Sequence, residues 1–168
     1  MRIFRTLWVL GLMLAAGGTA FGQKVTSSYD RDYGLSRLGI YEFAAHERVA
    51  SDPLAADTLM EQKVKDALED ALQRKGYHPS SEGVPPHFLV SFHAAARDKT
   101  DERGLGRSYV QGTLIVDFLD AETGRLVWRG IATGMVGAEA VDLRLAEEQV
   151  ERAAELLMEQ FGRDLLGF

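Results

Sequence analysis

Apolar residues recur at helical spacing in two segments of the chain. Between residues 58 and 75 they stand three or four positions apart, which predicts a helix that buries one stripe: Met60, Val64, Ala67, Leu68, Ala71 and Leu72. Gly76 follows where a helix needs a left-handed residue, so this helix is expected to end at Lys75. A second helix is predicted from about Leu143 to Phe161, ended by Gly162, with one apolar side: Ala146, Val150, Ala153, Leu157 and Phe161.

The remaining segments have the composition and alternation of strands. Strands are expected at 24–30, 38–43, 87–93, 109–119 and 125–132. In the fourth, Leu114, Val116 and Phe118 share one face, while Thr113, Ile115 and Asp117 share the other. Residues 121–124 have the composition of a turn between the last two of these strands. If Gly124 takes the left-handed position of a three-residue loop, Asp117 lies opposite Arg129.

The element order β-β-α-β-β-β-α predicts an α+β fold. Because strands and helices do not alternate strictly, a doubly wound parallel sheet is not expected. We predict a two-layer sandwich, in which two helices cover one face of a largely antiparallel sheet of about five strands. Residues 97–108 hold four basic and three acidic residues without an apolar period, so they are expected to form a long connection that is either mobile or functional. The strand order remains open.

The N-terminus predicts export from the cytoplasm. Arg2 and Arg5 precede the apolar run 7–16, which spans about 15 Å as a helix, half of a bilayer core. Small residues at 20 and 22 then fit a signal-peptidase site. Residues 1–22 are therefore predicted to be a signal peptide, cut after Gly22 or, as a second choice, after Ala20; an uncut anchor is the alternative. Residues 23–168 would form one domain, periplasmic or secreted, without a transmembrane segment.

The absence of cysteine and the acidic charge restrict the function classes. Without Cys, the lipobox-like segment 14–17 has no lipid-bearing thiol, so a lipid anchor is not expected. Disulfides and thiolate metal sites are excluded for the same reason. With 19 Lys and Arg against 25 Asp and Glu, the chain has a formal net charge of −6, which argues against nucleic acid as a partner.

The residues that most often perform catalysis or bind metals form no known motif. His46 and Glu47 begin a metalloprotease-like sequence, but Ala50 occupies the place of the second His. His87 and His93 lie about 20 Å apart on an extended strand, too far to share an ion. All four histidines, His78 included, are therefore expected at the surface or at a sheet edge, and no Gly-x-Ser-x-Gly elbow occurs. We therefore predict no catalytic, cofactor or metal site, and expect a protein that is not an enzyme.

The pair Trp128 and Arg129 is the one local feature with binding character. Aromatic and arginine side chains dominate contact hot spots between proteins. With Asp117 opposite Arg129, these three residues are the candidate partner contact. The alternative interpretation is a core Trp beside a solvated Arg.

Several sequence fragments together resemble one bacterial family. They are Tyr29-Asp30, the segments 38–43, 72–77 and 87–92, and most specifically Gly112–Asp120 and Leu126–Gly130. In this order, behind a signal peptide, the chain resembles the family called domain of unknown function 4136, mostly exported lipoproteins. The resemblance implies a location in the bacterial envelope and an α+β domain, and it transfers no catalytic residues. This chain departs from the family in lacking the lipid-bearing Cys and in having His87 where an acid is common.

Three functional hypotheses follow. The first is a non-enzymatic accessory or binding domain that contacts an envelope protein or another component associated with the outer membrane. The second is a hydrolase with dispersed residues, which needs a His beside Ser, Asp or Glu in a deep pocket. The third is a carrier of an apolar ligand, which needs a cavity of a few hundred Å³ between sheet and helices. The sequence leaves the oligomeric state open.

Overall fold

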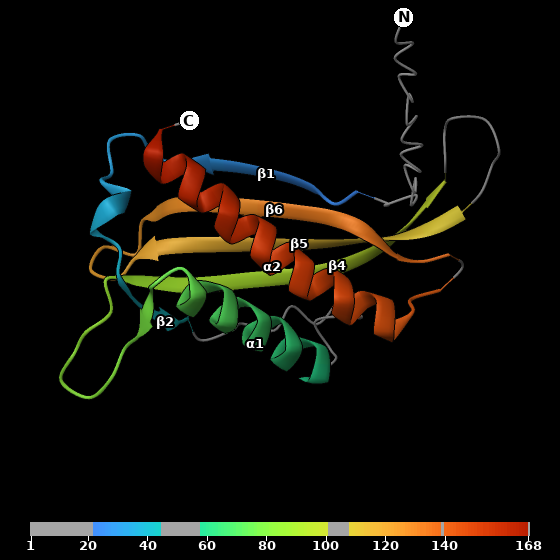
Figure 1. Cartoon of the computed structure of the whole chain (residues 1–168), viewed down its shortest axis with the longest axis horizontal. Coiled ribbons are helices and arrows are strands. Elements are labelled where there is room, and N and C mark those ends of the chain that lie inside the picture. Colours follow the sequence, from blue (N-terminus) through green and yellow to red (C-terminus); the bar gives the residue numbers. More distant parts are fainter. Residues whose placement is uncertain (1–21, 45–57, 101–107, 139, 168) are drawn as a thin grey trace, which may run out of the picture.

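The computed structural model describes residues 22–44, 58–100, 108–138 and 140–167 of the chain (Figure 1). Its helices are α1 (Thr58–Arg74), α2 (Leu143–Leu166) and the short 3-10 helix η1 (Leu35–Arg37). Its strands are β1 (Lys24–Tyr29), β2 (Ile40–Phe43), β3 (His78–Pro79), β4 (Phe88–Thr100), β5 (Ser108–Asp120) and β6 (Leu126–Gly137). Residues 1–21 of the predicted signal peptide and the His46 motif lie outside the described residues.

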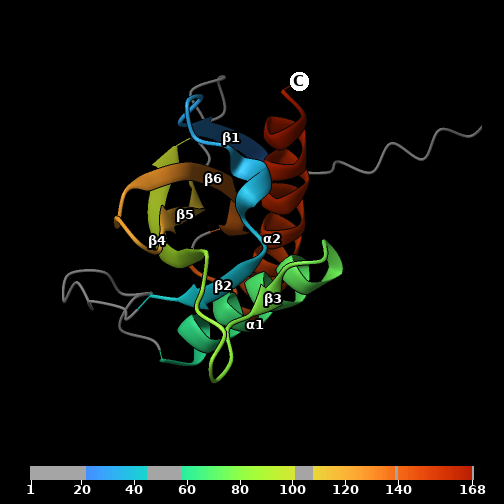
Figure 2. The same cartoon turned by 90° about the vertical axis from the view of Figure 1, so that its left-hand side faces the viewer.

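One sheet contains all six strands, in the order β1-β6-β5-β4-β2-β3. The strands β4, β5 and β6 form an antiparallel meander, and β1 pairs antiparallel with β6. At the other end β2 lies parallel to β4 and to β3. Figures 1 and 2 show both helices on the same side of this sheet. The predicted α+β sandwich is therefore confirmed, with the two-residue β3 as an additional strand.

The apolar stripe predicted for the first helix is confirmed. All six of its residues are buried in α1, and Gly76 follows the helix with a φ of +88°. In α2 the side chain of Asp142 caps the first turn by accepting a hydrogen bond from the Leu145 N–H at 3.1 Å. The predicted end of this helix was wrong. Gly162 is an ordinary helical residue, and α2 continues to Leu166 before Gly167 ends it at a φ of +74°.

The strand predictions differ from the structure mainly at strand ends. The second strand begins at Ile40 rather than residue 38. The connection predicted at 97–108 was also wrong, since 97–100 continue β4 and residue 108 begins β5. Residues 97–100 are exposed, so their pairing with 108–111 is held by backbone hydrogen bonds and leaves no apolar period in the sequence. The intervening residues 101–107 lie outside the described part.

The turn between β5 and β6 has four residues instead of the predicted three. The Asp120 N–H donates to the Arg125 carbonyl at 2.8 Å, and Gly124 has the predicted left-handed conformation, with a φ of +68°. Val127 then forms a bulge, because Phe118 pairs with Trp128 whereas Leu119 pairs with Leu126. The bulge compensates for the longer turn, so Asp117 pairs with Arg129 as predicted.

The core lies between the sheet and the two helices. Its centre is a cluster of aromatic rings that are at most 1% exposed: Phe88, Phe118, Trp128 and Phe161. The rings of Phe118 and Trp128 have their centroids 4.9 Å apart, and Phe161 of α2 packs edge-on against both. Among the described helices, none is both long and apolar enough to cross a membrane.

Candidate functional site

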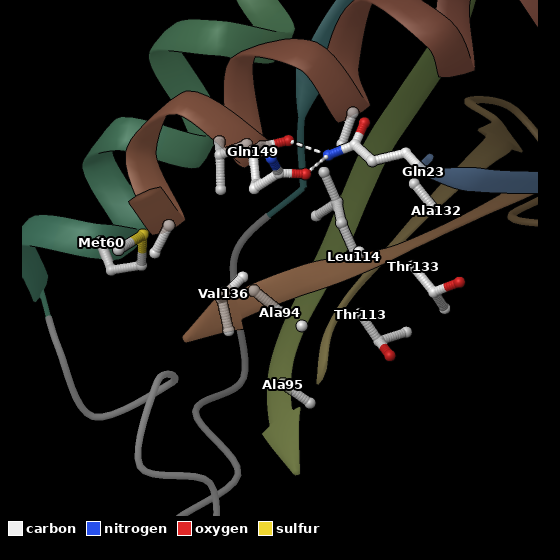
Figure 3. Close-up of a pocket in the computed structure, with 15 residues that line it drawn as sticks. Gln23, Met60, Ala94, Ala95, Thr113, Leu114, Ala132, Thr133, Val136 and Gln149 are labelled. Carbon is white, nitrogen blue, oxygen red and sulfur yellow. Dashed lines mark hydrogen bonds between the residues drawn. The ribbon is translucent and has the colours of Figure 1, made fainter. Parts of the chain in front are cut away.

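The central strands direct alternate side chains away from the helices. At Gly130 an added Cβ would lie 2.6 Å from Leu157 of α2, so residue 130 faces the helices and its neighbours Arg129 and Ile131 face away. Figure 3 shows Thr113 and Thr133 on the side of the strands that faces away from Gln149 of α2. We call the outward residues of β4, β5 and β6 the open sheet face: Leu89, Ser91, His93, Ala95, Thr113, Ile115, Asp117, Leu119, Arg129, Ile131, Thr133 and Met135.

The middle of the open sheet face is apolar. Ile115 pairs with Ile131, and Leu119 pairs with Leu89 on one side and Leu126 on the other. Within the described residues these side chains are only partly buried, and no helix covers them. Most apolar side chains of a small protein serve its core, whereas a contiguous and accessible apolar group is typical of a contact surface.

An ion pair borders this apolar group. The guanidinium of Arg129 donates from Nε to Asp117 Oδ1 and from Nη2 to Oδ2, both at 2.6 Å. These hydrogen bonds raise the pKa of Arg129 above its ordinary value. The Arg129 side chain is 44% exposed and that of Asp117 is 19% exposed, so solvent screens the pair. The two hydrogen bonds to Asp117 fix the orientation of the guanidinium, and the Arg129 side chain remains partly accessible to solvent.

Trp128 lies on the other side of the sheet from its neighbour Arg129. It is fully buried, and its Nε1–H donates to Asp164 Oδ2 at 2.8 Å. Asp164 also accepts a hydrogen bond from Gln160 at 2.9 Å, so both carboxylate oxygens of this buried acid have partners. The structure thus brings Asp117 and Arg129 together on the surface and places Trp128 in the core. Partner contact stays a prediction for the two surface residues.

A second polar cluster connects the β5–β6 turn to the chain after β1. The Tyr33 hydroxyl donates to Asp120 Oδ2 at 2.7 Å, while Thr123 donates to Oδ1 from its N–H at 2.8 Å and its hydroxyl at 2.6 Å. Hydrogen bonds from Thr123 and Tyr33 lower the pKa of Asp120 to about 2. Burial and the Asp120 carboxylate raise the pKa of Tyr33. Arg125 pairs with Asp30 at 3.0 Å, so this cluster holds together two connections.

The described histidines are not arranged around a common site. His78 and His87 are exposed, and His87 Nδ1 accepts a hydrogen bond from the Ile40 N–H at 3.3 Å. His93 lies on the open sheet face. In the described ranges, no three His, Asp or Glu side chains are grouped so that they could hold a metal ion. What these residues can offer is hydrogen bonding at the surface.

An apolar cavity lies between the sheet and α2, where α1 begins (Figure 3). Small side chains such as Ala94, Ala132 and Ala153 line it, and its volume is about 40 Å³. At its edge Gln23 Nε2 donates to the carbonyl and side-chain oxygens of Gln149, at 2.6 and 2.7 Å. The carrier hypothesis requires a few hundred Å³, so this space has room for about one or two water molecules and not for a lipid chain.

Sequence reasoning missed two features of the site. The role of Asp164 was not foreseen, although the stripe of α2 continues through this position and an acid on an apolar stripe signals a buried partner. The open sheet face was not foreseen either. Alternation along β5 indicated that Ile115 faces away from the core, but only the layer arrangement shows that no described helix covers it.

The chain is similar to several solved structures. A PDZ domain protein from Parabacteroides distasonis superposes with a TM-score of 0.60 at 12% identity; the match covers 83% of this chain and 36% of that protein. This chain therefore spans about a third of that protein, and the likeness shows the fold alone. The PelC dodecamer from Paraburkholderia phytofirmans (TM-score 0.46, 11% identity, 82% and 98% coverage) is also similar. So is a minor lipoprotein from Acinetobacter baumannii (TM-score 0.44, 10% identity, 76% and 91% coverage).

The sequence comparisons give the family. No curated protein matches the chain. The family model described as "Domain of unknown function (DUF4136)" matches residues 25–161, from the second residue of β1 to Phe161 in α2. This range contains every described strand and helix except the first residue of β1 and the last turn of α2. The chain thus belongs to the DUF4136 family, as the sequence fragments predicted.

Proposed function

We propose that this protein is a non-enzymatic accessory protein of the bacterial cell envelope, which binds another envelope component through its open sheet face. The observation that carries the proposal is the partly exposed apolar group of Ile115, Ile131 and Leu119, on the side of the sheet without a described covering layer. The predicted signal peptide and the family membership support an envelope location.

The composition of the open sheet face supports a protein partner or another component associated with the outer membrane. Interfaces typically combine an apolar centre with a polar border in which arginine is frequent. Here Ile115 and Ile131 form the centre, and the Asp117–Arg129 pair borders it. Because Ile115 and Ile131 are already partly buried, their complete burial by a partner would contribute less than the about 1.5–3 kcal/mol of a fully exposed side chain.

The hydrogen bonds of Asp120 indicate a structural role for this carboxylate. Each partner of Asp120 is a turn or loop group that the carboxylate holds in place, and these hydrogen bonds account for its lowered pKa. Its lowered pKa keeps Asp120 ionised, which suits a hydrogen-bond acceptor and opposes a role as a proton donor near neutral pH.

Site-specific crosslinking in living cells tests this proposal. A photoreactive residue replaces Thr133 on the open sheet face, in the wild type and in a variant with Ile115→Ser and Ile131→Ser. We expect one dominant crosslinked species in the wild type and at least a tenfold loss of it in the variant.

The control makes the same chemical change elsewhere. Val84→Ser combined with Leu166→Ser replaces two apolar residues that are 42% and 68% exposed and lie off the open sheet face. This control should retain the crosslinked species. Equal crosslinking in all three proteins, or none in the wild type, would contradict the proposal, and melting curves establish that each variant is folded.

A further inference from the structure

The two edges of the sheet are very different. At one edge β3 has two residues, and Pro79 lacks an N–H group, so this edge offers little to another strand. At the other edge β1 has six residues without proline, and its register with β6 is continuous from Lys24 to Tyr29. An edge of this length without proline or a bulge is a template for strand pairing.

The register with β6 shows which backbone groups of β1 point outward. The Asp30 N–H donates to the Val127 carbonyl at 3.0 Å, which makes positions 24, 26, 28 and 30 the ones that exchange hydrogen bonds with β6. Val25, Ser27 and Tyr29 therefore direct their N–H and C=O groups to the free edge. Among the described residues, no other strand pairs with this edge, which lies along the margin of the sheet in Figure 1.

We propose that β1 pairs antiparallel with β1 of a second copy of this chain, with Ser27 on the twofold axis. In this register Val25 lies opposite the partner's Tyr29 and Ser27 opposite its own copy, which gives about six backbone hydrogen bonds. On the outer side Thr26 lies opposite the partner's Ser28. Both sheets would then continue into one, with the helices of both copies on the same side.

Charge selects this register. It places Lys24 opposite the partner's Asp30, whose carboxylate already pairs with Arg125 of its own chain, so the contact adds a second cation beside that carboxylate at both ends. A register centred on Thr26 would place Lys24 opposite Ser28 and lose this pair. A register centred on Ser28 would recruit residues 31 and 32, which lie in the turn closed by the Tyr33 N–H and the Asp30 carbonyl. The inference does not depend on the envelope partner proposed above.

Sedimentation of the exported product of the full gene tests the pairing. We expect a reversible dimer in the wild type. Ser27→Pro removes an outward N–H without disturbing the bonds to β6, and should weaken dimerisation at least tenfold while the melting temperature changes little. Lys24→Glu places two carboxylates opposite each other and should weaken it severalfold, whereas Lys75→Glu makes the same charge change at an exposed position after α1 and should not.

Crosslinking locates the axis. Because the chain has no cysteine, Ser27→Cys introduces a single thiol, and opposed Cα atoms about 5.5 Å apart are within disulfide range. Mild oxidation should yield a covalent dimer for Ser27→Cys and almost none for Ser81→Cys, at the opposite edge. A wild type that is monomeric at all concentrations, a Ser27→Pro variant that dimerises like the wild type, or equal crosslinking of both cysteine variants would overturn the proposal.

Discussion

The two faces of the central sheet are both rich in apolar residues, and they differ in what covers them. On the helix side Phe118 and Trp128 are fully buried by Phe161 and its neighbours in α2. On the other side Ile115 and Ile131 are partly accessible, next to an ion pair. Residue type alone therefore does not separate core from surface here. The position of the helices separates them. The free energy of unfolding should therefore depend far more on residues of the helix side than on residues of the open sheet face.

Trp128 and Arg129 give the sharpest version of this comparison, because they are neighbours in sequence on opposite faces. Trp128→Ala empties the aromatic core and leaves the Asp164 carboxylate without one of its donors. We expect the free energy of unfolding to fall by about 3–5 kcal/mol. Arg129→Ala, as the matched control, should lower it by at most about 1 kcal/mol. Chemical denaturation measures both, and similar losses for the two variants would contradict the assignment of faces.

Gly130 tests how closely the helix side is packed. An added Cβ would clash with the Trp128 ring and would lie 2.6 Å from Leu157 Cδ2. We expect Gly130→Ala to lower the free energy of unfolding by about 1–3 kcal/mol, because the ring and α2 must shift.

Gly162→Ala is the control for this substitution. No atom lies within 4 Å of the added Cβ, and residue 162 is inside α2. Because Ala favours the helix, this variant should be more stable by about 0.5–1 kcal/mol. If Gly130→Ala behaved like Gly162→Ala, the contact between β6 and α2 would be looser than the structure shows.

The open sheet face should contribute little to stability even where its contacts are well formed. In a double-mutant cycle with Asp117→Ala and Arg129→Ala, we expect a coupling energy of about 0.2–1 kcal/mol, reduced by added salt. Urea denaturation of the four proteins measures it. A coupling of several kcal/mol that salt leaves unchanged would mean that this pair is shielded from solvent and would contradict its place on the open sheet face.

Asp120 is the last residue of β5, beside the β5–β6 turn, and gives the smallest effect. Its pKa is about 2 in the folded protein, below the ordinary value of 3.8, so the folded state binds fewer protons at this position than the unfolded state. Its stabilising contribution is complete above about pH 4 and is lost as the pH falls toward about 2. Denaturation between these pH values should show a shallower loss of stability for Asp120→Asn than for the wild type, and equal slopes would contradict this.

Local patterns in the sequence predicted the elements better than their ends or their partners. The stripe of α1 could be predicted residue by residue, because helical spacing directly reflects one buried side. The length of β4 could not, because residues 97–100 are exposed and pair through backbone groups that every residue has. The same is true of Gly162, where packing of the last turn of α2 outweighs the modest helix penalty of glycine.

In the candidate site too, local features could be predicted from the sequence, whereas contacts between distant elements could not. The opposition of Asp117 and Arg129 followed from turn chemistry and strand alternation, and the bulge at Val127 corrected the error in turn length. The open sheet face depends on contacts between elements distant in sequence, which no local pattern encodes. The parallel placement of β2 beside β4 is likewise decided by the fold as a whole.

The pairing of β1 with β6 has a consequence for the order in which the chain assembles. Lys24 pairs with Thr133, which lies roughly a hundred residues later in the chain, so β1 is synthesised long before β6. The meander of β4, β5 and β6 needs only nearby segments and can form first. β1 therefore remains unpaired until the meander has formed. We expect its pairing with β6 to be a late and slow step in folding.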